Sequence, residues 1–119
     1  MIRVKRVYED PSPDDGARFL VDRLWPRGLS KETLALTAWL KDVAPSNDLR
    51  RWYNHEPEKW PEFQRRYSAE LAANPAAQSA LETLRAHARK GTVTLLFSSR
   101  EEERNNATAL KALLEKRAK

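Results

Sequence analysis

The sequence predicts a single small α/β domain with three layers, in which a short, mostly parallel sheet has helices on both faces. Three short apolar runs, at roughly 2–8, 17–22 and 92–97, are typical of buried strands. Segments with helical spacing separate these runs, which favours a sheet covered by helices. A chain of 119 residues is long enough for one compact domain and too short for two, so residues 1–119 are expected to form one domain.

The N-terminal part of the chain predicts two strands joined by a loop. Ile2, Val4 and Val7 have basic residues between them, which indicates the first strand. The segment 9–16 contains two prolines, three aspartates and a glycine, a composition that a strand ladder does not accept. We therefore expect a loop there, followed by a second strand at about 17–22.

A helix is expected to begin after Ser30. Ser30 and Thr33 resemble a capping box, with Ser30 as the N-cap. The apolar residues that follow have mostly helical spacing: Leu34, Leu36, Trp39, Leu40 and Val43. Pro45 is expected to end this segment, because proline disfavours a helical conformation in the residue before it.

Three further helices are expected before the last strand. Ser46 or Asn47 can cap a short helix that carries Leu49, Trp52 and Tyr53. A longer helix follows Pro57, and its large apolar residues recur at spacings of three and four: Trp60, Phe63, Tyr67 and Leu71. The sequence Asn74-Pro75 ends that helix and begins another, which Lys90-Gly91 is expected to stop.

The clearest strand in the sequence lies at 92–97. It is rich in β-branched residues and nearly continuously apolar, which indicates burial on both faces. A last helix is expected at about 102–117, with an apolar stripe formed by Ala107, Leu110, Leu113 and Leu114. The pattern leaves room for a short fourth strand.

The composition excludes several classes of site. Cysteine is absent, so disulfides, thiolate metal sites and cysteine nucleophiles are excluded, and a reducing cytoplasm is compatible. The first residues form no apolar stretch of signal-peptide length, and no apolar run reaches transmembrane length. We therefore expect a cytoplasmic protein with no membrane partner.

The charge balance is compatible with an anionic partner. The formal net charge is +5, from 22 Lys and Arg against 17 Asp and Glu. This permits a nucleic acid, a nucleotide or another small anion. The alternative is a solvated basic surface, because acidic residues are interspersed with the basic ones. Neither a helix-turn-helix signature nor an RNA-recognition aromatic pair is evident.

The stretch from Asp22 to Gly28 is the strongest candidate for a functional turn. An acid, two arginines, a tryptophan, a proline and a glycine follow directly after a buried strand. Pro26 holds the preceding Trp25 extended, so the chain must leave the strand there. Gly28 permits a tight or left-handed backbone. Trp25 either walls a site and stacks on a ligand ring or forms a lid over the sheet edge.

A candidate site follows from pairing this strand with the strand at 92–97. If the two are parallel neighbours, their carboxyl ends lie together, where ligands bind in open α/β sheets. Arginine forks and free N–H groups at a helix start suit phosphate or carboxylate. The ligand-binding candidates are Arg23, Trp25, Arg27, Ser98, Ser99, Arg100, Asn105 and Asn106.

Two residues are candidates for catalysis at this site. Asp22 can act as a base, or can orient a ribose hydroxyl or an arginine; the alternative is a structural ion pair with an arginine. His55 lies among aromatic residues, where it can act as a general acid or base or can stack on a ligand. The alternative for His55 is a turn histidine. His87 is expected on the surface, and two distant histidines without thiols predict no metal site.

Four stretches together resemble one family: DRLWPRGLSK, WLKDVAPS, LRRWYNHEPEKWPEFQRRYSAEL and VTLLFSSREEERNNATALKALLE. They are similar to the YeaO-like branch of the domain-of-unknown-function 488 family, and the resemblance covers nearly the whole chain. The DRLWPRG and HEPEKW stretches are the specific ones. The resemblance implies a small cytoplasmic bacterial α/β protein and assigns no activity.

The resemblance also marks individual positions in this chain. They are Asp22, Arg23, Trp25, Pro26, Arg27, Gly28, Lys41, Pro45, Ser46, Trp52, His55, Pro57, Trp60, Asn105 and Asn106. The broader family often has a cysteine and a Cys-His-Arg run near the last strand and helix. This chain has Phe97-Ser98-Ser99 and Arg104-Asn105-Asn106 there, so any thiol chemistry of distant relatives does not transfer to it.

These observations together predict a protein that binds a small phosphorylated or nucleotide-like anion at the carboxyl edge of the sheet. Hydrolase or transferase chemistry at that edge stays open. The alternative is a basic module that binds nucleic acid or a protein partner without catalysis. The sequence assigns no cofactor, no metal and no oligomeric state.

Overall fold

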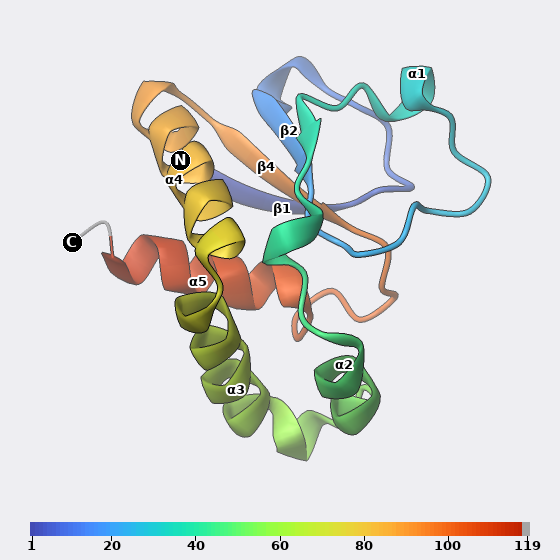
Figure 1. The fold of residues 1–119 in the computed structure, drawn as a ribbon. Coiled ribbons are helices and arrows are strands. Elements are labelled where there is room, and N and C mark those ends of the chain that lie inside the picture. Colours follow the sequence, from blue (N-terminus) through green and yellow to red (C-terminus); the bar gives the residue numbers. More distant parts are fainter. Residues whose placement is uncertain (118–119) are drawn as a thin grey trace.

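The computed structural model describes residues 1–117 of the chain (Figure 1). Within them, four strands form one parallel sheet in the order β1-β4-β2-β3. The strands are β1 (Ile2–Arg6), β2 (Ala17–Leu20), β3 (Ala38–Trp39) and β4 (Val93–Phe97). The helices are α1 (Lys31–Leu34), α2 (Asn47–Tyr53), α3 (Trp60–Ala73), α4 (Pro75–Lys90) and α5 (Asn106–Arg117). The prediction of one α/β domain with a short parallel sheet is therefore confirmed.

Strand β4 is the centre of the sheet. It pairs with β1 on one side and with β2 on the other, and all five of its residues are buried. Side chains alternate along a strand, so Leu95 and Leu96 enter different hydrophobic clusters on opposite faces. Burial on both faces explains the nearly continuous apolar sequence of this strand.

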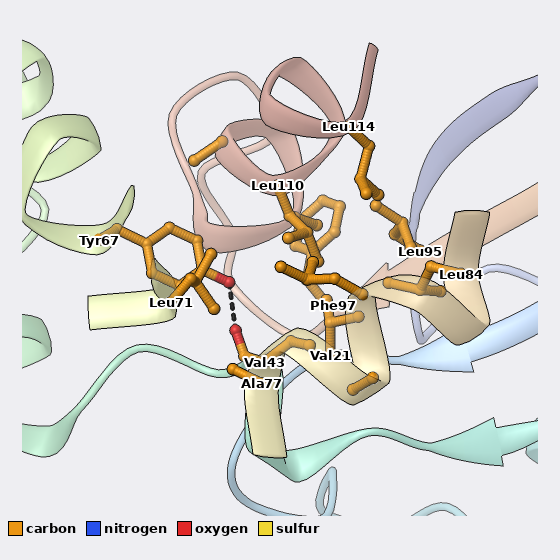
Figure 2. Close-up of a cluster of buried hydrophobic side chains, with 14 of the residues drawn as sticks. Val21, Val43, Tyr67, Leu71, Ala77, Leu84, Leu95, Phe97, Leu110 and Leu114 are labelled. Atoms are coloured by element: carbon orange, nitrogen blue, oxygen red, sulfur yellow. Dashed lines mark hydrogen bonds between the residues drawn. The ribbon is translucent and has the colours of Figure 1, made fainter. Parts of the chain in front are cut away.

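Helices α2 to α5 form the larger layer, on the face that carries Phe19 and Leu95. Figure 1 shows α3 and α4 following one another along one side of the molecule, with α5 crossing them. Figure 2 shows the core between these helices and the sheet, where the Tyr67 hydroxyl donates a hydrogen bond to the carbonyl of Val43. Burial, with a smaller contribution from the charge of Asp22, raises the pKa of this hydroxyl, so it remains a donor.

A thinner layer covers the opposite face. Leu34 of α1 packs there with Val7, Leu20 and Leu96. Partly buried side chains complete this second cluster: Trp25, Leu29, Leu36 and Trp39. Helical residues therefore cover both faces of the sheet, although α1 has only four residues.

A buried ionic cluster lies beside this thinner layer. The carboxylate of Asp15 is fully buried and accepts hydrogen bonds from Arg18 Nη1 at 2.5 Å and from Lys5 Nζ at 3.1 Å. The backbone N–H of Ser12 donates to it at 3.0 Å. Burial alone would raise the pKa of Asp15, but these donors outweigh that effect and lower it. The sequence predicted only a loop here, because the burial of an acid depends on distant partners.

The predicted helix begins after Ser30 as expected, but its predicted extent to residue 43 is wrong. Helix α1 ends at Leu34 because Ala35 adopts a left-handed conformation, with φ 49°, and its N–H donates to Lys31 O. The chain then forms β3, which pairs with β2 through Ala38 and Trp39. Backbone pairing with a neighbouring strand has overridden the helical spacing, and β3 is the short fourth strand for which the pattern left room.

Other element boundaries also differ from the predictions. The first two strands end at Arg6 and Leu20, earlier than expected. The last helix begins at Asn106 rather than near 102, because Asn105 Oδ1 accepts the N–H of Thr108 and so caps the helix later in the chain. His87, expected on the surface, is half-buried, with its ring centroid 5.1 Å from that of Phe19.

The predicted caps of two helices are confirmed. Ser30 Oγ accepts the N–H of Thr33 and begins α1, and Ser46 Oγ accepts the N–H of Leu49 and begins α2. As expected, a helix also begins at Asn74-Pro75, where Asn74 Oδ1 accepts the N–H of Ala76. None of the helices in residues 1–117 combines the length and the apolar character that a bilayer-spanning segment needs.

Candidate functional site

The ends of β2 and β4 meet at the carboxyl edge of the sheet. Their parallel register places Leu20 opposite Leu96, so Asp22 and Ser98 each lie two residues beyond this last pair. Ser98 donates its backbone N–H and its hydroxyl to Asp22 Oδ2, each at 2.8 Å. The prediction that these two residues lie at adjacent strand ends is confirmed.

Asp22 does not form the arginine ion pair that the sequence suggested. Its second oxygen, Oδ1, accepts a hydrogen bond from Asn106 Nδ2 at 3.0 Å, and within residues 1–117 no lysine or arginine forms an ion pair with it. Its backbone carbonyl accepts the indole N–H of Trp39 at 2.7 Å. Neutral donors from Ser98, after β4, and from Asn106 of α5 therefore hold the carboxylate, and Trp39 of β3 holds the backbone carbonyl. Asp22 thus ties these elements to the end of β2.

Arg23 is anchored by backbone carbonyls instead. Its Nη2 donates to Ala44 O and Pro45 O at 3.3 Å, and its Nε donates to Pro45 O at 3.4 Å. Nη1 has no hydrogen-bond acceptor among the described residues. Arg23 is thus held in place while one edge of its guanidinium remains available.

Arg27 is exposed, and its guanidinium makes no hydrogen bond or ion pair to the part of the chain that the structure describes. Only its backbone is engaged, through a hydrogen bond from the Tyr8 hydroxyl to Arg27 O at 3.3 Å. Arg27 therefore presents its whole guanidinium to solvent.

These strand ends border a cavity of about 600 Å³. It brings together nine of the ten predicted site residues: Asp22, Arg23, Trp25, Arg27, His55, Ser98, Ser99, Asn105 and Asn106. Arg100, the tenth candidate, is exposed and does not line this cavity.

Trp25 and His55 line this cavity together with Arg27, as predicted. The Trp25 indole N–H donates to Leu29 O at 2.7 Å, and its ring meets Trp39 edge-on at 5.4 Å, so Trp25 both holds the turn and forms a wall. His55 is exposed in a left-handed turn, with φ 54°, and its ring centroid lies 6.2 Å from that of Tyr53. Within residues 1–117 no hydrogen bond orients its imidazole.

Several of the predicted ligand-binding side chains are engaged in holding the site itself. Asn105 is buried; its amide donates to Glu101 O at 2.8 Å and its oxygen caps α5. Ser99 Oγ accepts the N–H of Glu101 at 3.1 Å, and Ser98 is bonded to Asp22. These contacts fix the loop before α5, so the loop shapes the cavity wall.

The sequence reasoning missed further residues that line the cavity: Tyr8, Leu24, Pro45, Arg50, Arg51, Tyr53, Asn54, Phe63 and Arg104. Arg50 and Arg51 lie on α2, and their present partners, Asn47 and Asp48, are exposed neighbours on the same helix. Such surface pairs contribute little to stability, so a ligand can replace them. Only the packing of α2 against the sheet edge reveals these residues.

Arg104 lines the cavity from the loop before α5. It forms an ion pair with Glu101 at 3.1 Å, and its backbone carbonyl accepts the Tyr53 hydroxyl at 3.2 Å. Burial, together with the charge of Glu101, raises the pKa of Tyr53, so its hydroxyl stays protonated and donates. Five arginines therefore line the cavity, whereas Asp22 is the one acidic residue among the lining residues.

The described residues contain no group of three or more His, Cys, Asp or Glu side chains placed to hold a metal ion. The cavity is lined by guanidinium groups, hydroxyls and aromatic rings, together with the Asp22 carboxylate and the His55 imidazole. Guanidinium forks suit phosphate and carboxylate groups.

Comparisons with known proteins identify the family of this chain. Residues 1–119 match the DUF488-N3i family, described as the inactive DUF488-N3 subclade. An uncharacterized protein of Mycobacterium tuberculosis is 46% identical over 113 residues, which cover 95% of this chain and 92% of that protein. A protein of Mycobacterium bovis shows the same identity and coverage. No solved structure matches this chain.

A third relative bears the name of the branch that the sequence motifs resemble. The uncharacterized protein YeaO of Escherichia coli is 40% identical over 109 residues, which cover 92% of each chain. The family match over the whole chain and this identity show that the chain is a YeaO-like member of the DUF488 family.

Proposed function

We propose that the cavity binds a small phosphorylated or nucleotide-like anion and performs no reaction on it. The observation that carries this proposal is the charge of the lining: five arginines surround one acid, and both oxygens of that acid already accept hydrogen bonds. Arg51 and Arg104 already form ion pairs with Asp48 and Glu101. Arg23, Arg27 and Arg50 form no ion pair within residues 1–117, so a free anion would neutralise positive charge that remains there.

Arg23 and Arg27 are the principal anion-binding residues in this proposal. Arg23 is fixed by three hydrogen bonds to carbonyls, so little side-chain freedom is lost when its remaining Nη1 binds a ligand. Arg27 is exposed and offers its whole guanidinium fork. Charge-assisted contacts of this kind contribute about 1.5–3 kcal/mol each.

Four observations support binding without catalysis. Asp22 is engaged by Ser98 and Asn106, so it is committed to holding the strand ends. Among residues 1–117, no hydrogen-bonding group orients His55 as an acid or base. The chain has no cysteine, and the subclade that it matches is described as inactive.

The concave position of the arginines favours a small ligand over nucleic acid. A nucleic-acid-binding module would be expected to present a basic stripe on a convex face. Arg23 and Arg27 instead line a cavity of about 600 Å³, within the usual range for small-molecule sites. The absence of cysteine from the sequence also supports a cytoplasmic location as part of this proposal.

Titration calorimetry with inorganic phosphate and pyrophosphate tests the proposal. Wild type is expected to bind, and Arg27→Ala is expected to bind about 10- to 150-fold more weakly, which corresponds to the loss of one charge-assisted contact. Arg100→Ala is the matched control, because Arg100 is an exposed arginine near the same edge that does not line the cavity. Equal losses in the two variants, or no binding by wild type, would overturn the proposal.

A further inference from the structure

We propose that Tyr8 is a stacking platform for a nucleobase, so that the ligand of the cavity is a mononucleotide rather than a bare phosphate or a sugar phosphate. This inference rests on the proposed function, because it takes the arginines as the phosphate site and adds a site for the base. It begins from a residue that the sequence did not single out.

Tyr8 is one of the few large apolar side chains that the fold leaves exposed. Among residues 1–117 these are Met1, Tyr8 and Leu24, and the latter two both line the cavity. Tyr8 is 45% exposed and Leu24 is 66% exposed. Apolar surface gathered at the mouth of a polar cavity indicates a ligand with an apolar or planar part.

The ring of Tyr8 is held in place although it is exposed. Its hydroxyl donates to Arg27 O at 3.3 Å, and the guanidinium carbon of Arg6 lies 5.1 Å from the ring centroid. Arg6 is fixed in turn, with Nε donating to Ser99 O at 2.9 Å and Nη2 to Ser98 O at 3.2 Å. Because the ring is already oriented, little side-chain conformational entropy is lost when a ligand stacks on it.

The position of this ring suits a ligand that has a base at one end and a phosphate at the other. Tyr8 touches the backbone of Arg27, whose side chain forms no ion pair within residues 1–117. A ligand that stacks on Tyr8 therefore has its charged group beside an arginine. The cavity of about 600 Å³ leaves most of its space unfilled by a phosphate alone, and a base and a ribose would use that space.

Comparing the affinities of the full chain for AMP, ribose 5-phosphate and adenosine separates the contribution of the base from that of the phosphate. Wild type is expected to bind AMP more tightly than ribose 5-phosphate by about 5- to 150-fold, the range for stacking of one base on an aromatic side chain. Tyr8→Ala is expected to remove that advantage and to leave the affinity for ribose 5-phosphate unchanged. Tyr8→Phe keeps the ring and is expected to keep most of the advantage.

The outcomes distinguish this inference from the proposed function. Equal binding of AMP and ribose 5-phosphate by wild type, or an equal loss of both in Tyr8→Ala, would refute the stacking role while leaving phosphate binding intact. Tyr8-dependent binding of adenosine with no binding of ribose 5-phosphate would support the platform and refute the phosphate site. Unfolding curves of both variants, expected to match wild type because the ring is exposed, show that each is folded.

Discussion

The carboxylate of Asp22 accepts two hydrogen bonds from Ser98, one from the backbone N–H and one from the hydroxyl, and both are 2.8 Å long. The residues are 76 positions apart in the sequence and follow neighbouring strands. Asn106 adds a third donor from α5. This cluster fixes the edge of the sheet at which the cavity opens.

Replacing Asp22 is therefore expected to destabilise the fold. Asp22→Ala removes the acceptor of three hydrogen bonds and should lower the free energy of unfolding by about 1–3 kcal/mol, whereas Ser98→Ala removes one hydroxyl donor and should cost about 1 kcal/mol. Urea unfolding of both variants measures these losses. Asp42→Ala is the control, because Asp42 is exposed. A loss in Asp22→Ala no greater than that in Asp42→Ala would show that the cluster does not stabilise the edge.

A second prediction concerns the stability of the fold in acid. The hydrogen bonds and charges of Lys5, Arg18 and Ser12 hold the pKa of the buried Asp15 below its ordinary value despite the opposing effect of burial. A carboxyl whose pKa is lower in the folded than in the unfolded state contributes stability above the unfolded pKa, about 3.9. That contribution is lost as the pH falls through the folded pKa.

The free energy of unfolding is therefore expected to decrease as the pH falls below about 4. Asp15→Asn should be less stable than wild type at pH 6, and the difference should shrink in acid. Denaturant unfolding between pH 2 and pH 6 measures both curves. If the free energy of unfolding changed with pH in the same way for both proteins, Asp15 would not be the cause of the loss of stability in acid.

Gly16 and Gly28 give a third prediction, because both have positive φ but differ in their surroundings. A Cβ at Gly16, where φ is +62°, would lie 2.2 Å from Thr92 O, whereas a Cβ at Gly28, where φ is +77°, would meet nothing within 4 Å. Gly28→Ala is expected to cost only backbone strain, about 1 kcal/mol, and Gly16→Ala more than that. Gly91→Ala is the control, since φ there is extended and the space is open. Thermal unfolding of the three variants ranks them, and a smaller loss at Gly16 than at Gly28 would contradict the close contact.

Local sequence signals predicted the parts of the site that depend on one segment. Pro26 and the acid and arginines around it mark the turn after β2, and a parallel pairing was enough to bring Asp22 next to Ser98. The missed parts depend on contacts between distant segments. Tyr8 reaches the cavity because β1 pairs with β4, and Asp15 is buried because Lys5 and Arg18 surround it.

Contacts between distant segments also explain why the predicted continuation of the helix to residue 43 is wrong. Leu36, Trp39 and Leu40 have helical spacing, but a two-residue ladder with β2 and the hydrogen bond from the Trp39 indole to Asp22 O determine the backbone there. A pattern of apolar residues indicates which side chains are buried. It does not indicate whether the backbone can form hydrogen bonds with a neighbouring strand.

Arg27 gives a fourth prediction, which separates binding from folding. Its side chain makes no contact of hydrogen-bond or ion-pair type with the described chain, so Arg27→Ala should change the free energy of unfolding by less than about 0.5 kcal/mol. Urea unfolding beside the calorimetric titrations measures this. A stability loss as large as that of Asp22→Ala would return Arg27 to a structural role.

The most direct test of the central claim, that the arginine-lined cavity is an anion site, is an NMR titration of the isotope-labelled full chain with inorganic phosphate. The account predicts amide and guanidinium shift changes confined to the cavity, at Arg23, Arg27 and Ser98, and their loss in Arg27→Ala. Shift changes centred on the exposed arginines of α3, Arg65 and Arg66, or no changes at all, would contradict it.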